Sequence, residues 1–165
     1  MLGRTYEGQN CSAARTLELM GERWSFLIIR DAVFSGVTRF REFQRRLGVA
    51  PNILKNRLDG FVADGLMEKH AYANSDRTQE YVLTDKGRDL RPVLIALSAW
   101  GDRWLAPDGP PVIYTHAECG GDLDQLTRCT ACGEEHHNLA TATRPGPGAT
   151  RKPAALSSTT DAQAG

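Results

Sequence analysis

Apolar residues recur every three or four positions along most of the first hundred residues, a spacing that predicts amphipathic helices. The predicted helices cover residues 12–20, 22–34, 39–47, 51–64 and 84–105. Ser12 and Thr38 stand where they can cap the first and third of these helices. Pro51 falls in the first turn of the fourth helix, where proline is tolerated, whereas Pro92 is expected to kink or break the last one.

Between the fourth and the last helix the pattern changes to that of strands. Residues 66–72 and 78–84 are predicted to be two short strands around the polar segment 73–77, which together make a hairpin. Two short helices that meet at Gly48 are the parts of a helix-turn-helix, and the hairpin after them is its wing. We therefore predict a mainly α fold with a small β component (α+β), a winged helix-turn-helix domain over residues 1–106.

The C-terminal third has a different composition. Residues 107–143 contain three of the four cysteines and three of the four histidines, and we predict a small Cys-rich β-hairpin extension there that resembles a zinc ribbon. Residues 144–165 are dominated by Pro, Gly, Ala, Ser and Thr, with almost no large apolar residue. Such a segment cannot bury enough surface to offset chain entropy, so it is predicted to be a disordered tail.

The formal net charge of zero hides a separation of charge along the chain. Residues 1–106 carry 16 Lys and Arg against 13 Asp and Glu, while residues 107–165 carry 4 against 7. The positive charge is concentrated around the Gly48 bend, where it can attract a polyanion.

These observations predict that the helix after the bend enters the major groove of DNA. Asn52, Lys55, Asn56 and Arg57 would lie near base edges or phosphates, with Pro51 at the start of this helix. The remaining predicted DNA contacts are to the phosphate backbone, from Arg39, Arg41, Arg45, Arg46 and, at the wing tip, Arg77. An alternative left open by the sequence is that some of these arginines only solvate a helix.

Four segments of the sequence serve as landmarks, "GERW", "RFREFQRRLGVAPNILKNRL", "YVLTDKG" and "AWGDRW". In these segments the chain resembles the HxlR family of bacterial transcription regulators, which is related to the MarR group. The resemblance covers residues 11–104. It implies a homodimer that binds a pseudo-palindromic double-stranded DNA operator, with the first and last helices at the dimer interface. We expect such a dimer to act as a repressor that is released by a signal, for example a small-molecule effector.

The cysteines suggest a second kind of regulator, a thiol- or metal-responsive sensor. Cys11 precedes the first helix, where the helix dipole lowers a thiol pKa, and some members of the family sense oxidants through a matching cysteine. Alternatively, Cys11 simply packs against the partner subunit. A structural zinc ion is the cofactor that the extension suggests, with the ligands His116, Cys119, Cys129 and Cys132, and with His136 or His137 as substitutes for His116. A metal-free, reduced cluster is the alternative.

Other classes of function have less support in the sequence. We predict no enzyme, because no nucleophile elbow, phosphate-binding glycine loop or paired carboxylates are visible. No apolar run approaches the roughly 20 residues that cross a bilayer, and no signal peptide is evident, so a cytoplasmic location is expected. An effector pocket could be lined by the aromatic residues Trp24, Phe26, Tyr72, Trp100 and Trp104.

Overall fold

The computed structural model describes residues 6, 8–72 and 75–149, without the side chains of residues 72–78. The helices of this part are α1 (Ser12–Met20), α2 (Ser25–Ser35), α3 (Phe40–Leu47), α4 (Pro51–Ala63), α5 (Asp85–Arg88) and α6 (Arg91–Leu105). The strands are β1 (Met67–Tyr72), β2 (Ser75–Leu83), β3 (Thr127–Arg128) and β4 (Glu135–His136). None of the helices described is both long and apolar enough to cross a membrane.

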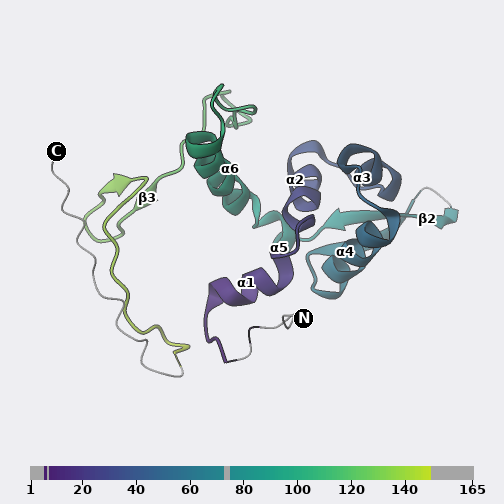
Figure 1. Cartoon of the computed structure of the whole chain (residues 1–165), viewed down its shortest axis with the longest axis horizontal. Helices are drawn as coiled ribbons and strands as arrows, with labels where there is room; N and C mark the ends of the chain where they lie inside the picture. The colour runs from purple at the N-terminus through teal and green to yellow at the C-terminus, as the bar shows by residue number, and fades with distance from the viewer. Residues whose placement is uncertain (1–5, 7, 73–74, 150–165) are drawn as a thin grey trace.

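The core lies where α2, α3 and α4 meet the β1–β2 hairpin (Figure 1). Phe43 of α3 and both Leu54 and Leu58 of α4 are completely buried, as are Ile28 and Ile29 of α2. Ile28, Phe43, Leu54 and Leu58 belong to the apolar stripes of the sequence, so the helical spacing correctly indicated the inward face of α2, α3 and α4. The order of elements confirms the predicted winged helix-turn-helix.

The bend between α3 and α4 depends on Gly48. This residue adopts φ +62°, a left-handed conformation that costs glycine little, and its N–H donates to the Gln44 carbonyl at 2.9 Å. Ala50 then precedes α4 in an extended conformation, and Pro51 is the first residue of the helix. The chain thus turns sharply and starts the second helix at a fixed angle.

The wing is larger than the sequence indicated, because a third segment joins it. β1 and β2 pair antiparallel, with Met67 opposite Leu83. The chain just before α3 pairs with β2: the Tyr81 N–H donates to the Thr38 carbonyl at 2.8 Å. The Thr38 hydroxyl donates to Glu80, so Thr38 does not cap α3 as predicted, and Arg39 holds the capping position without a side-chain bond.

Two further local predictions have clear outcomes. Ser12 lies inside α1, and Cys11 occupies the capping position instead. The predicted long last helix is divided into α5 and α6, with Pro92 in the first turn of α6, which confirms the expected break. The apolar spacing predicts one inward side of this helix, formed by Leu90, Val93, Leu94, Leu97, Trp100 and Trp104, but of these only Leu94 is buried.

The remaining apolar face of α6 is exposed in the single chain. Trp100 and Trp104 are 58 % and 63 % exposed, and Val93 and Leu97 extend the same stripe toward the start of the helix. Leu17 of α1 is also exposed. In Figure 1, α1 and α6 lie at one end of the domain and α3, α4 and the hairpin at the other.

Beyond α6 the chain forms two very small hairpins. The first is closed by a bridge between Thr115 and Asp122, and the second is the β3–β4 pair. Of the predicted tail, residues 144–149 are described, and the carbonyl of Gly148 accepts a hydrogen bond from the Asn10 side chain at 2.7 Å. Residues 150–165 of that predicted tail lie outside the described part of the chain.

Candidate nucleic-acid interface

Helix α4 has two different faces. Leu54, Leu58 and Phe61 fix its inner face in the core. Asn52 and Asn56 lie on the opposite, exposed face, and the exposed Lys55 lies beside them. Asparagine offers a donor and an acceptor that match the adenine edge, and lysine can donate to guanine. The structure therefore brings together three of the four predicted residues on one accessible surface of this helix.

Lys55 already has a partner on this surface. Its ammonium group pairs with the Asp59 carboxylate one turn along α4, and Lys69 from β1 donates to the same carboxylate at 2.6 Å. The hydrogen bonds from Lys55 and then from Lys69 hold the pKa of the Asp59 carboxyl below its ordinary value. A phosphate that binds to Lys55 would thus compete with a carboxylate that stays ionised.

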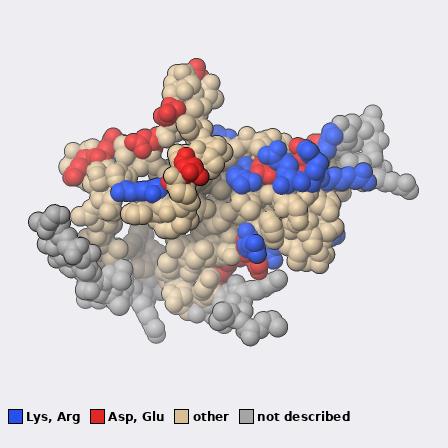
Figure 2. Space-filling view, turned by 45° about the horizontal axis from the view of Figure 1, so that its top comes forward, with Lys and Arg blue, Asp and Glu red and all other residues tan. Residues whose placement is uncertain are grey.

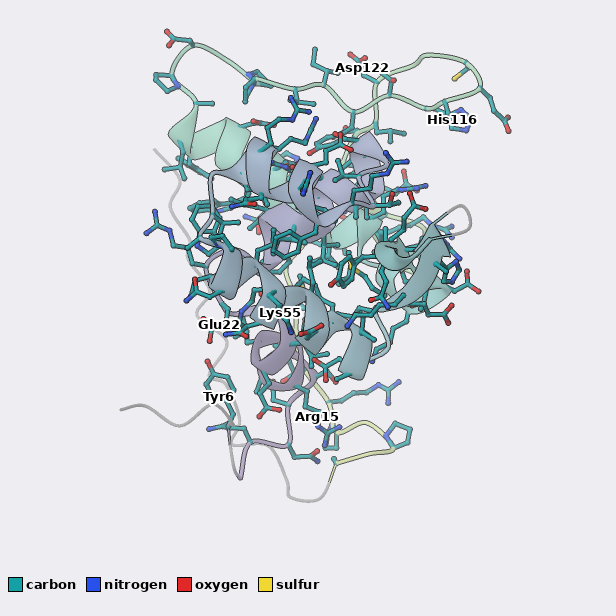
Figure 3. The ribbon with its side chains drawn as sticks, turned by 90° about the vertical axis from the view of Figure 1, so that its right-hand side faces the viewer. Tyr6, Arg15, Glu22, Lys55, His116 and Asp122 are labelled. Atoms are coloured by element: carbon teal, nitrogen blue, oxygen red, sulfur yellow. The ribbon has the colours of Figure 1, made fainter. Side chains whose placement is uncertain are left out.

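The fourth predicted residue of α4, Arg57, lies on a different side of the helix. Its guanidinium is 3.4 Å from Glu22, and its side chain is only 21 % exposed. Arg57 and Glu22 line a groove of about 660 Å³ between α1 and α4, whose wall also includes Tyr6 and Leu17. Figure 3 shows Tyr6 and Glu22 near one another in this region. The contact with Glu22 gives Arg57 a role in joining α4 to the segment before α2.

The arginines of α3 and its start form the basic part of the surface. Arg39, Arg41 and Arg45 are exposed. Arg39 pairs with Glu80 at 3.3 Å, and Arg45 lies 4.0 Å from Glu42. Figure 2 shows basic side chains gathered over the part of the molecule that contains α3, while acidic side chains gather over the end of α6 and the extension. The separation of charge along the sequence is therefore also a separation in space.

Arg46, whose side chain is 37 % exposed, is bound to α2 instead. Its guanidinium donates to Asp31 at 3.1 Å and to the Ser35 hydroxyl at 2.8 Å. Asp31 is 2 % exposed, and Arg30 donates twice to its other oxygen, at 2.7 and 3.0 Å. Sequence reasoning missed this buried carboxylate, because one Asp in an apolar helix gives no signal of which distant arginine it binds.

The other predicted binding residues are placed as follows. The side chains of Arg77, at the wing, and of Tyr72 lie outside the described part. Trp24 and Phe26 pack against the core, and Trp100 is exposed. Two cavities of about 270 and 180 Å³ are smaller than the groove between α1 and α4. Trp24, Phe26, Trp100 and Trp104 line neither these cavities nor the groove, so these three hollows are not the predicted aromatic pocket.

Cys11 has the local environment that the sequence suggested. It is exposed at the start of α1 and makes no regular capping bond. Nevertheless, the backbone N–H groups of Ala14 and Ala13 approach its sulfur and lower the pKa of the thiol, and the charge of Arg15 acts in the same direction.

The predicted zinc ligands form two separate pairs. His116 Nδ1 lies 3.2 Å from Cys119 Sγ, and the Cys132 side chain hydrogen-bonds with Cys129. Backbone N–H groups of Cys132 and Ala131 lower the pKa of the Cys129 thiol. Within the described residues, no three His, Cys, Asp or Glu side chains are grouped to hold one metal ion.

A helix-turn-helix with a polar second helix, a basic first helix and an adjoining wing defines a winged-helix DNA-binding protein. Comparison with known families agrees: the HxlR-like helix-turn-helix family matches residues 19–109. The chain belongs to this family, a group of transcription regulators and not of enzymes, which confirms the resemblance seen in the sequence.

The similarity to relatives of known sequence extends beyond the winged domain. Uncharacterized HTH-type transcriptional regulators of Mycobacterium tuberculosis and Mycobacterium bovis are each 42 % identical over 148 residues, which is 89 % of this chain and 92 % of theirs. A match of that length necessarily includes part of the C-terminal extension.

Solved structures resemble the chain as well. The crystal structure of PA1607, a protein described as a putative transcription factor, shares 44 % sequence identity, with a TM-score of 0.67 over 74 % of this chain and 87 % of that one. The reduced form of the redox regulator HypR shares 28 % identity, with a TM-score of 0.51 over 56 % of this chain and 92 % of its own.

Proposed function

We propose that this regulator is a homodimeric repressor that binds a pseudo-palindromic operator and releases it in response to a signal. The observation that carries the proposal is the exposed face of α4, where Asn52, Lys55 and Asn56 stand opposite the buried leucines. This face lies next to the basic surface of α3. Helix α4 would read bases while Arg39, Arg41 and Arg45 bind phosphates.

The dimer is proposed from the apolar stripe of α6. Val93, Leu97, Trp100 and Trp104 recur along one face of the helix and are all exposed in the single chain. A contiguous apolar surface of this kind typically marks a protein interface. A two-fold axis beside α1 and α6 would leave the α4 helices of both subunits free for two half-sites.

The dimer can be tested with a charge in the stripe. Leu97→Asp is expected to give monomers in sedimentation velocity experiments and to weaken operator binding strongly. Val112→Asp is the matched control, because Val112 is similarly exposed but lies outside α6. A Leu97→Asp protein that stays dimeric would contradict this interface.

The operator is tested by selecting bound fragments from genomic DNA and footprinting them. The expected result is an inverted repeat whose half-site centres lie about one helical turn, or about 34–36 Å, apart. Failure to enrich any fragment at low salt, with a folded protein, would refute the DNA-binding proposal. Transcription from the enriched promoter, measured with and without the regulator, then distinguishes a repressor from an activator.

A second candidate is that the signal is an oxidant or electrophile sensed by Cys11. It is favoured by the exposure of this thiol and by the backbone N–H groups that lower its pKa. The similarity to the redox regulator HypR supports the same idea. Cys11→Ser should abolish oxidant-dependent release from DNA while leaving affinity in reducing buffer unchanged. Release that persists in the variant would exclude Cys11 as the sensor.

A further inference from the structure

The extension contains two turns of the same construction. In the first, residues 116–121, the Gly120 N–H donates to the His116 carbonyl at 2.8 Å, and the His116 N–H donates to the Gly121 carbonyl at 2.8 Å. In the second, residues 129–134, Gly133 and Cys129 make the equivalent bonds, both at 2.9 Å. We call these segments the first and second knuckle.

The backbone conformation of the two knuckles also agrees. Gly120 and Gly133 follow the last sulfur-bearing residue of their knuckle and adopt φ +72° and +77°. These left-handed residues let the chain fold back, so that the first and fourth residues of each knuckle project together. His116 and Cys119 are paired in this way, at 3.2 Å between Nδ1 and Sγ.

The second knuckle presents two sulfur atoms. The N–H groups of Ala131 and Cys132 point at the Cys129 sulfur, and all the cysteines of the extension are free thiols. Cysteine binds metal as the thiolate. Three thiolates and one imidazole make a ligand set of the Cys₃His type, which favours tetrahedral Zn²⁺.

The first knuckle is held against the winged domain. Tyr114, two residues before it, lies 3.1 Å from the Ser98 hydroxyl of α6, and its ring centroid is 4.6 Å from that of Phe34 in α2. Figure 3 shows His116 and Asp122 on this hairpin, clear of the helical core. The second knuckle follows after the short segment 122–128, so the linkage between the knuckles is short.

We propose that the two knuckles of one chain close on a single structural Zn²⁺, with His116 and Cys119 supplying two ligands and Cys129 and Cys132 the others. Each knuckle already holds its own pair of ligands together, while the two pairs are separate in the structure. Binding of the ion would bring the two pairs together, because metal binding supplies folding free energy to small sites of this kind. Binding releases the thiol protons of the three cysteines to solvent.

His116 is a better fourth ligand than its neighbours in the second hairpin. His136 Nδ1 accepts the Asn138 N–H at 3.0 Å, and its ring stacks on His137 with centroids 4.2 Å apart. His136 and His137 also lie beyond the second knuckle, whereas His116 occupies in the first knuckle the position that Cys129 occupies in the second.

The test measures bound metal on the full-length protein after incubation with Zn²⁺ and removal of the excess. We expect one zinc per chain by elemental analysis, and thiolate-to-metal absorption bands of a tetrahedral site when Co²⁺ replaces Zn²⁺. Cys129→Ser and His116→Ala should lower the zinc content well below one per chain. Cys11→Ser and His137→Ala are the matched controls and should keep it.

Two results would overturn the proposal. The first is a zinc content near zero in the unmodified protein, or one unaffected by Cys129→Ser. The second comes from mixed dimers in which one chain carries His116→Ala with Cys119→Ser and the other carries Cys129→Ser with Cys132→Ser. A site within each chain leaves these dimers without zinc, whereas recovery of one zinc per dimer would show that the ligands come from two chains. DNA affinity measured on the same samples tests the proposed function separately.

Discussion

Arg45 and Arg46 are neighbours in the sequence, yet their surroundings predict that replacement by alanine affects a different property in each case. Arg45 is 76 % exposed, and its nearest acidic partner, Glu42, is 4.0 Å away and itself exposed. Arg46 instead donates to the buried carboxylate of Asp31. We therefore expect Arg45→Ala to affect DNA binding and Arg46→Ala to affect mainly stability.

The size of each effect follows from these contacts. Each phosphate contact contributes about 0.9 to the slope of log K against log salt, so Arg45→Ala should reduce this slope by about 1.8 per dimer. The same variant should change the free energy of unfolding by less than about 0.5 kcal/mol, because an exposed ion pair contributes little. Arg46→Ala leaves Asp31 with Arg30 as its ionic partner, and we expect a loss of about 1–3 kcal/mol in stability.

The assays are fluorescence anisotropy of labelled operator over a range of salt concentrations and urea unfolding followed by circular dichroism. Arg128→Ala is the control, because Arg128 is exposed in the extension, away from α3, and pairs with Glu135 at 3.7 Å. The reasoning is refuted if Arg45→Ala leaves the salt slope unchanged. It is also refuted if Arg46→Ala reduces the slope without any loss of stability.

Four other predictions follow from the structure. Asn52→Ala should change the preferred operator in a randomised DNA library, because this side chain faces outward from α4; an unchanged preference would assign base reading to other residues. Asp59→Asn should strengthen binding to all duplexes, since it frees Lys55 and Lys69 from a carboxylate; equal or weaker binding in anisotropy would contradict this. The rate of Cys11 alkylation by iodoacetamide should fall with decreasing pH around a midpoint below that of an unperturbed cysteine thiol, because the pKa of Cys11 is lowered by the backbone N–H groups of Ala14 and Ala13. A midpoint at the ordinary value would show that the helix start does not stabilise the thiolate. Gly87→Ala should lower the melting temperature, since an added Cβ would lie 2.2 Å from a backbone carbonyl oxygen; an unchanged melting curve would mean that this contact relaxes freely.

The sequence alone determined the winged helix-turn-helix, because that information is local. The apolar spacing defines which face of α2, α3 and α4 is buried, and Gly48 and Pro51 mark the bend and the start of α4. The break before α6 followed from Pro92 for the same reason. Each of these features depends on residues within one or two turns of one another.

Tertiary structure decided the partners of the charged residues. The six basic residues of 39–57 look alike in sequence, yet Arg46 is bound to Asp31, Arg57 to Glu22 and Lys55 to Asp59. Most of these partners lie on other elements, and long flexible side chains can reach several of them. Packing of α2 against α3 brings Asp31 beside Arg46, and no periodicity in the chain records that contact.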